Sequence, residues 1–149
     1  LRAVDGRELV SARPVRFPVS CEVAYDYLVA PDNRAAWQSS LRTVEDVMGD
    51  DGVVGQSWTD VTGVGIKPRM ELTDADRPHR WSESGTWGRF RATLTLTFVP
   101  APGACCDVEA AMEVRASGLL RPLGLAADRL APHAVRGDLR RAAAILERG

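Results

Sequence analysis

The sequence predicts an α+β fold in which a curved antiparallel β-sheet of about six to seven strands surrounds a long C-terminal α-helix. Residues 90–98 and 108–116 alternate apolar and polar side chains, which is the period of half-buried antiparallel strands. Residues 120–148 instead carry apolar side chains at helical spacing. Hairpin turns join all the later strands, and no βαβ crossover is present, so the sheet should be antiparallel.

The N-terminal part is expected to contain an edge strand and two short helices. Pro14 and Pro18 exclude a helix over residues 8–19, which are rich in strand formers. Ser20 is then a good N-cap for a first helix. A second helical turn, capped by Asp32, should end at Trp37. The apolar face of the first helix is expected to contain Val23, Tyr27 and Leu28.

Turn signals divide the middle of the chain into strands. The strongest is Gly-Asp-Asp-Gly at residues 49–52, which predicts a hairpin. Glycine or proline marks the later turns as well. The predicted turns are at residues 62–65, 76–78, 85–88 and 100–103. The predicted strands are residues 41–48, 55–61, 67–73, 79–84, 90–98 and 107–116.

The C-terminal helix is expected to have two arms, because Pro132 removes a backbone hydrogen bond and should kink it. The first arm should form a wall of the interior, and the second should anchor the helix. The inward stripe of the first arm contains Leu119, Leu123, Ala127, Leu130 and Ala134. The stripe of the second arm contains Val135, Leu139, Ala142 and Leu146.

Composition limits the function classes. A length of 149 residues fits one domain over residues 1–149. The net charge is −1, and the arginines are scattered among acidic residues, which argues against a nucleic-acid surface. No stretch approaches the ~20 apolar residues of a membrane span, so we expect no stable membrane insertion.

The cysteine content favours a reduced, cytoplasmic protein. The chain has three cysteines, Cys21 and the neighbours Cys105 and Cys106, an odd number without the spacing of a secreted disulfide framework. The N-terminus also lacks the apolar core of a signal peptide. We therefore expect free thiols and a cytoplasmic location.

Several local phrases resemble the polyketide cyclase/dehydrase and lipid transport superfamily, which includes START domains and birch-pollen-allergen-like proteins. The resemblance spans residues 12–147. Its opening phrase covers residues 18–37 and includes Pro31-Asp32-Asn33 before Trp37. The other matching phrases are Gly55 after an acidic turn, Arg77-Pro78-His79-Arg80-Trp81, and the helix from Asp138-Leu139 to Leu146-Glu147. The resemblance implies a helix-grip fold with an internal cavity for apolar molecules.

Three functions remain open at this point. The first is binding of a small apolar or aromatic molecule, such as a lipid or polyketide, without a cofactor. The second is an enzyme of the polyketide cyclase, aromatase or dehydratase type, which confines its substrate and supplies one acid or base. The third is a protein-interaction or chaperone-regulating module. The resemblance identifies no catalytic residues in this chain. The oligomeric state also stays open, and a homodimer is one of the options.

Tryptophans and carboxyls are the best candidates for the cavity. Strand alternation places Asp60 on the same face as Trp58, and Glu83 on the same face as Trp81. A buried carboxyl is a potential acid or base, and Glu83 is the preferred polar contact. The alternative is that each carboxyl only pairs with an arginine such as Arg69 or Arg91. The predicted ligand-binding residues are Trp37, Trp58, Met70, Trp81, Glu83, Phe90, Met112, Leu123 and Leu130.

The histidines add one further candidate. His133 lies at the border of the inward helical stripe and could act as an acid or base, whereas His79 should be a solvated strand start. Neither spacing matches a zinc site, and Cys105 and Cys106 are too close together for a CxxC pair. The catalytic candidates are therefore Glu83, Asp60 and His133, and no metal is expected.

Overall fold

The computed structural model describes residues 13–149, except for the side chains of residues 120–132. Its elements are β1 (Val15–Phe17), α1 (Cys21–Val29), α2 (Pro31–Trp37), β2 (Leu41–Met48), β3 (Ser57–Thr62), β4 (Arg69–Asp76), β5 (Arg80–Trp87), β6 (Phe90–Ala101), β7 (Cys105–Ala116), the 3-10 turn η1 (Gly118–Leu120) and α3 (Arg121–Arg148). This order confirms the predicted sequence of strands and helices.

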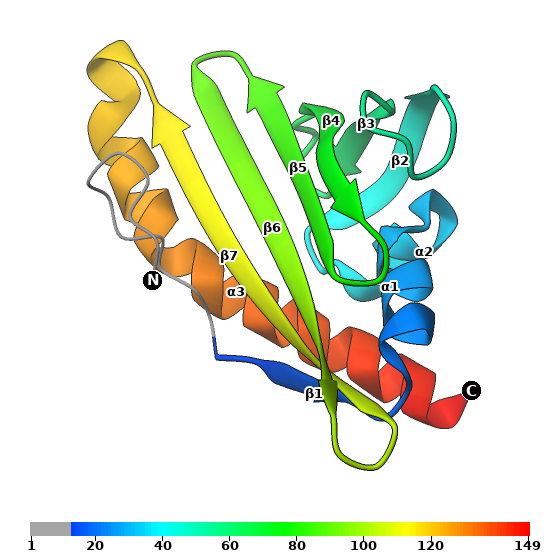
Figure 1. Cartoon of the computed structure of the whole chain (residues 1–149). Helices are drawn as coiled ribbons and strands as arrows, with labels where there is room; N and C mark the ends of the chain where they lie inside the picture. The colour runs from blue at the N-terminus through cyan, green and yellow to red at the C-terminus, as the bar shows by residue number, and fades with distance from the viewer. Residues whose placement is uncertain (1–12) are drawn as a thin grey trace.

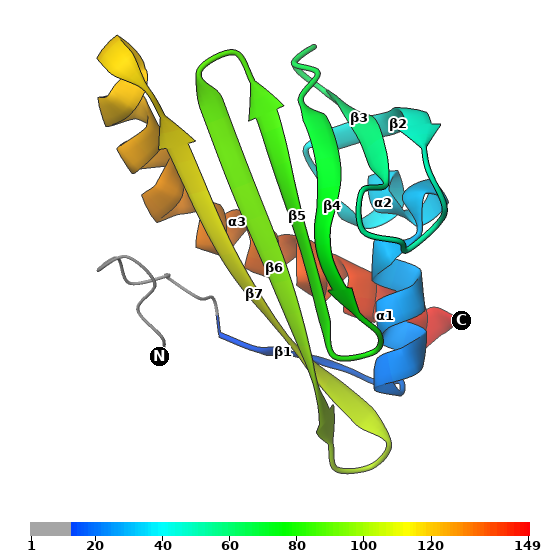
Figure 2. The ribbon, with the colours of Figure 1, turned by 45° about the horizontal axis from the view of Figure 1, so that its top comes forward.

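Seven strands form one antiparallel sheet in the order β1-β7-β6-β5-β4-β3-β2. The sheet curves along α3, and α1 and α2 lie beside the C-terminal part of that helix (Figures 1 and 2). The chain therefore has the predicted α+β class and the helix-grip arrangement. The core lies between the sheet and the three helices.

Apolar and polar side chains alternate along β6 and β7, which gives the sheet one buried face and one exposed face. Leu94 pairs with Met112 and Phe98 with Val108, and the side chains of Phe98 and Val108 are buried. Thr97, between two inward residues of β6, is exposed. The predicted faces of these two strands are therefore correct.

Strand β5 is longer than predicted, because Gly85 belongs to the strand and not to the turn. Gly85 pairs with Met70 of β4, and a Cβ atom at Gly85 would lie 2.4 Å from the Met70 sulfur. A glycine lets the Met70 side chain lie across the neighbouring strand. The turn itself is confined to the residues around Gly88, which has a φ of 55°.

Helix α1 presents a different face from the one predicted. The Ser20 hydroxyl accepts a hydrogen bond from the Val23 backbone N–H, as expected for an N-cap. Val23 itself is exposed and Tyr27 is half-buried. The buried residues are Cys21, Ala24, Tyr25 and Leu28. Tyr25 turns inward because it packs on Phe98, with 5.1 Å between the ring centroids.

Helix α2 begins two residues earlier than predicted. Its N-cap is Ala30, which makes no side-chain hydrogen bond, so the predicted cap at Asp32 is wrong. Pro31 occupies the first turn. A proline is tolerated there because a backbone N–H at that position would have no acceptor within the helix.

Helix α3 continues through Pro132, and its first part runs at a different inclination from its last part in both views (Figures 1 and 2). In the last part, Leu139 and Ala142 are fully buried, as the anchoring stripe predicts. Leu119 is 97% exposed and does not belong to an inward stripe, because it lies in η1 before the helix. The predicted inward residues Leu123, Ala127 and Leu130 lie outside the described side chains. No helix of the described residues is long and apolar enough to cross a membrane.

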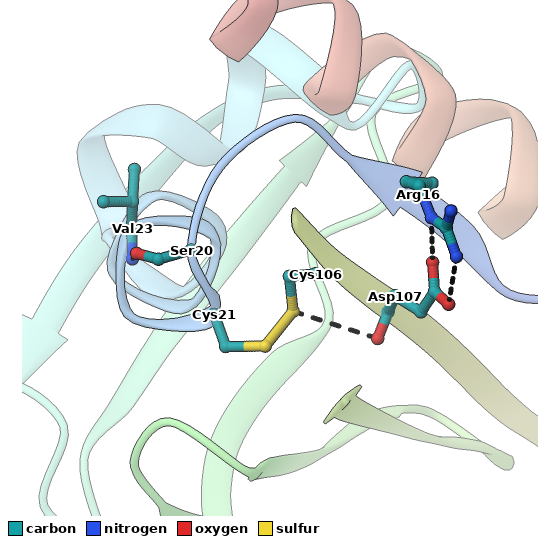
Figure 3. Close-up of a disulfide and its surroundings, with 6 residues drawn as sticks. All are labelled: Arg16, Ser20, Cys21, Val23, Cys106 and Asp107. Carbon is teal, nitrogen blue, oxygen red and sulfur yellow. Dashed lines mark hydrogen bonds and ion pairs between the residues drawn. A yellow bond between two sulfur atoms is a disulfide. The ribbon is translucent and has the colours of Figure 1, made fainter. Parts of the chain in front are cut away.

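A disulfide between Cys21 and Cys106 ties the start of α1 to β7 (Figure 3). This corrects the expectation that all three cysteines are free. Neighbouring residues of a strand point to opposite faces, so only Cys106 reaches α1 and Cys105 stays a thiol. Disulfides are typical of oxidising compartments, so the cytoplasmic location stays a prediction.

Reduction of this disulfide should lower stability substantially. The two cysteines are 85 positions apart in the sequence, and for a loop of this length chain entropy predicts a loss of about 4.5 kcal/mol in the free energy of unfolding. Urea denaturation with and without a reductant would measure the loss. Cys21→Ser should reproduce it, and Cys105→Ser should leave stability unchanged. A native protein with three reactive thiols and no response to reductant would contradict the assignment.

Candidate functional site

A cavity of about 440 Å³ lies between the sheet, α2 and α3. Its volume is in the range of small-molecule sites. Strands β4, β6 and β7 provide most of its apolar wall. The apolar residues of that wall include Met70, Phe90, Ala92, Leu94, Met112 and Val114.

The cavity extends to the turns at one end of the central strands. Ile66, of the β3–β4 turn, and Trp87 and Phe90, at the β5–β6 turn, all line it. Trp87 is 44% exposed and stacks on Phe90, with 5.9 Å between the ring centroids. Trp87 lines the cavity and is also exposed to solvent. The mouth of the cavity therefore lies at this end of the strands.

A buried ion pair forms the polar end of the cavity. Arg34 donates from Nη1 to Glu83 Oε2 at 2.8 Å and from Nη2 to Oε1 at 2.6 Å. Both residues line the cavity, yet Arg34 is only 3% exposed and Glu83 only 2%. Burial opposes the charge of Arg34, but the attraction of Glu83 and Asp60 outweighs it and raises the Arg34 pKa.

Two tryptophans hold the two carboxyls in place. Trp81 Nε1–H donates to Glu83 Oε2 at 2.8 Å, and Trp58 Nε1–H donates to Asp60 Oδ1 at 3.0 Å. The Arg34 guanidinium also lies over the Trp58 ring, 5.1 Å from its centroid, in cation–π geometry. Each indole therefore satisfies its N–H group on a carboxyl two residues further along its own strand.

Asp60 is the less neutralised of the two carboxyls. Its Oδ2 lies 4.0 Å from Arg34 Nη2, too far for a hydrogen bond. Burial raises the pKa of Asp60 to about 6, and the negative charge of Glu83 adds to this rise. Arg34 and the Trp58 N–H act in the opposite direction but do not cancel it. Asp60 therefore changes its protonation state near neutral pH.

Two buried donors at this end have no hydrogen-bond partner among the residues that the structure describes. They are Arg34 Nε and Trp37 Nε1, and both residues line the cavity. An unpaired buried N–H group costs about 1–3 kcal/mol. Both groups belong to residues that line the cavity, so a ligand acceptor that reached either N–H would remove this cost.

Strand alternation predicted the inward direction of Asp60 and Glu83, but the arginine that joins them was missed. The predicted partner Arg69 instead donates to Ser57 Oγ and Thr59 Oγ1, and Arg91 is exposed. Two inward carboxyls close together require a nearby cation. That requirement was the available signal, but the sequence does not show which arginine fulfils it.

The structure gathers five of the predicted ligand-binding residues around the cavity: Trp37, Met70, Glu83, Phe90 and Met112. Trp58 and Trp81 are buried and are not among the residues that line the cavity. Leu123 and Leu130 lie outside the described side chains.

His133 does not belong to the site. It is exposed and absent from the cavity lining, because it precedes the inward-facing Val135 by two residues, about 200° around the helix. Within the described residues, no three His, Cys, Asp or Glu side chains cluster in a way that could hold a metal ion.

Asp60→Asn should stabilise the protein in a pH-dependent way. The folded state raises the Asp60 pKa from 3.8 to about 6, so the folded wild type binds the extra proton and loses stability as the pH rises through this window. The variant should match the wild type below about pH 4 and exceed it by about 2–3 kcal/mol at about pH 8. Urea denaturation across this range measures the difference. A difference that is the same at every pH would contradict the buried, raised-pKa state.

Comparison with known proteins places this geometry in a family. A search of curated proteins found no match. Among solved structures, a START superfamily protein from Mycobacterium smegmatis has a TM-score of 0.75 at 11% identity, covering 93% of this chain and 97% of that one. Ara h 8.0201 has a TM-score of 0.72 at 10% identity, covering 94% and 97% of the two chains.

A protein of Mesorhizobium loti has a TM-score of 0.71 at 16% identity, covering 93% of this chain and 98% of that one. At such identities the structural matches show the fold alone. The family described as polyketide cyclase/dehydrase and lipid transport matches residues 10–148, which is nearly the whole chain. The chain therefore belongs to the polyketide cyclase/dehydrase and lipid transport family.

Proposed function

We propose that this protein binds a small apolar or aromatic molecule, such as a lipid or polyketide, in the cavity between the sheet and α3. One observation carries the proposal: a cavity of about 440 Å³ has apolar walls and a buried polar cluster at one end. Apolar walls provide affinity, and a few placed polar groups provide orientation. Membership of the family supports the same class of ligand.

The apolar walls can supply most of the binding free energy. A ligand that removes about 200 Å² of apolar surface from water gains about 5 kcal/mol at ~25 cal/mol per Å². The walls come from strands β4, β6 and β7, whose backbones are fixed by antiparallel pairing. A preformed cavity of this kind loses little conformational entropy when the ligand binds.

Asp60, and not Glu83, is the better polar contact for a ligand. Both oxygens of Glu83 accept hydrogen bonds from Arg34, and one accepts a further bond from Trp81. Glu83 therefore serves mainly to hold Arg34. Asp60 is bonded by Trp58 through Oδ1, and its Oδ2 is left for a ligand.

A second candidate is an enzyme of the cyclase or dehydratase type, and the pKa of Asp60 is the observation that favours it. A carboxyl with a pKa of about 6 beside an apolar cavity can accept or donate a proton near neutral pH. Asp60→Asn should then abolish turnover of a poly-β-ketone substrate and leave its binding nearly intact. Unchanged turnover in this variant would exclude Asp60 as the acid or base.

The third candidate, a protein-interaction module, would be favoured by a cavity filled with side chains. The open cavity of about 440 Å³ between the described residues does not support this candidate.

A thermal-shift screen of fatty acids, isoprenoids, flavonoids and polyketide mimics would test the binding proposal directly. A ligand at a hundred times its dissociation constant stabilises the folded state by ~2.7 kcal/mol.

Ala92→Trp should block binding without unfolding the protein. Ala92 lines the cavity, so the added indole would occupy the ligand's space. Binding of the neutral fluorophore N-phenylnaphthylamine should weaken by about tenfold or more, as measured by fluorescence titration. Thr97→Trp is the matched control, because Thr97 is exposed on the same strand. Equal binding by both variants would show that ligands bind elsewhere.

A further inference from the structure

We infer that the cavity selects uncharged ligands that carry a hydroxyl group and rejects carboxylates with the same apolar framework. This inference rests on the proposed binding function and specifies its ligand class. It follows from the charges and the hydrogen-bonding groups at the polar end of the cavity.

Among the described residues, the charges at this end leave no cation free for a carboxylate. The usual receptor for a carboxylate is an arginine fork, but both terminal nitrogens of Arg34 already donate to Glu83. Glu83 also neutralises Arg34, so Asp60 is left as an excess negative charge in its ionised form. A ligand carboxylate would face this charge in a partly desolvated site, where like charges repel strongly.

The other charged residues of the lining do not reverse this balance. Asp138 of α3 adds a further carboxyl, which accepts a hydrogen bond from the Ser39 backbone N–H. Arg91 of β6 is exposed, and solvent screens its charge. Among the described residues, the positively charged side chains of the lining are Arg34 and Arg91, and the negatively charged ones are Asp60, Glu83 and Asp138.

The hydrogen-bonding groups match a hydroxyl. Trp37 Nε1–H and Arg34 Nε–H are buried donors without a partner in the described part of the chain, so they require an acceptor. Ionised Asp60 is an acceptor, so it requires a donor. A hydroxyl oxygen accepts and its proton is donated, whereas an ether, a ketone or a carboxylate can only accept.

The test compares probes that share one apolar framework. Naphthol, naphthalene and naphthoate would be titrated calorimetrically against the wild type at about pH 8, where Asp60 is ionised. Dodecanol and dodecanoate provide the same comparison on a linear chain. Naphthol should bind about tenfold or more tightly than naphthalene, and naphthoate should bind more weakly than naphthalene.

Three variants assign the selection to individual groups. Asp60→Asn keeps the size of the side chain and removes its charge, so naphthoate should bind about tenfold more tightly than it does to the wild type. Trp37→Phe keeps most of the ring and removes the unpaired N–H, so the advantage of naphthol over naphthalene should shrink several-fold. Thr97→Val removes a polar group from an exposed position of β6 outside the cavity lining, so it should leave that advantage intact.

The outcomes separate the inference from the proposed function. Naphthoate binding as tightly as naphthol would overturn the selection and leave apolar binding standing. An unchanged preference in Asp60→Asn and in Trp37→Phe would overturn it as well, since neither group would then contact the ligand. Failure of every probe to bind the folded wild type would overturn the proposed function and the selection together.

Discussion

The buried pair of Arg34 and Glu83 is the interaction on which the site depends. Two charges removed from water are costly, and breaking such a pair by removing one partner typically costs about 3–5 kcal/mol. Helix α2 must therefore dock where Arg34 meets β5. That position brings Trp37, three residues later on the same helix, to the cavity wall.

The second constraint is the pairing of each tryptophan with a carboxyl on its own strand. Trp58 and Trp81 bring large apolar surfaces into the core and need acceptors for their N–H groups. Asp60 and Glu83 provide those acceptors. The cost falls on Asp60, because its burial is only partly compensated and its pKa rises to about 6. A group kept at such a cost is typical of a functional site, where stability is exchanged for a pre-organised contact.

Local sequence patterns were enough to predict which side chains of the sheet point inward. They did not predict the contacts between residues that are far apart in the sequence. The alternation in β6 and β7 and the two-residue spacing from Trp81 to Glu83 are local, so the inward directions were correct. Arg34 and Glu83 are 49 residues apart, and Cys21 and Cys106 are 85 apart, so no local period connects them. Gly85 misled the prediction because a glycine favours a turn locally, whereas here it makes room for Met70 on the next strand.

The two ends of the long strands have different roles, and this difference indicates where a ligand enters. At the start of β7, the disulfide joins α1 to the strand, and the ion pair of Arg16 with Asp107 joins β1 to it (Figure 3). Nearby, Tyr25 of α1 packs on Phe98 of β6. About ten residues further along β7, or ~33 Å, the strands end in the turns that carry Trp87 and η1. Trp87 is exposed there while it lines the cavity. A ligand that enters between these turns meets Trp87 and Phe90 first, and its apolar framework then lies against the walls that β4, β6 and β7 provide.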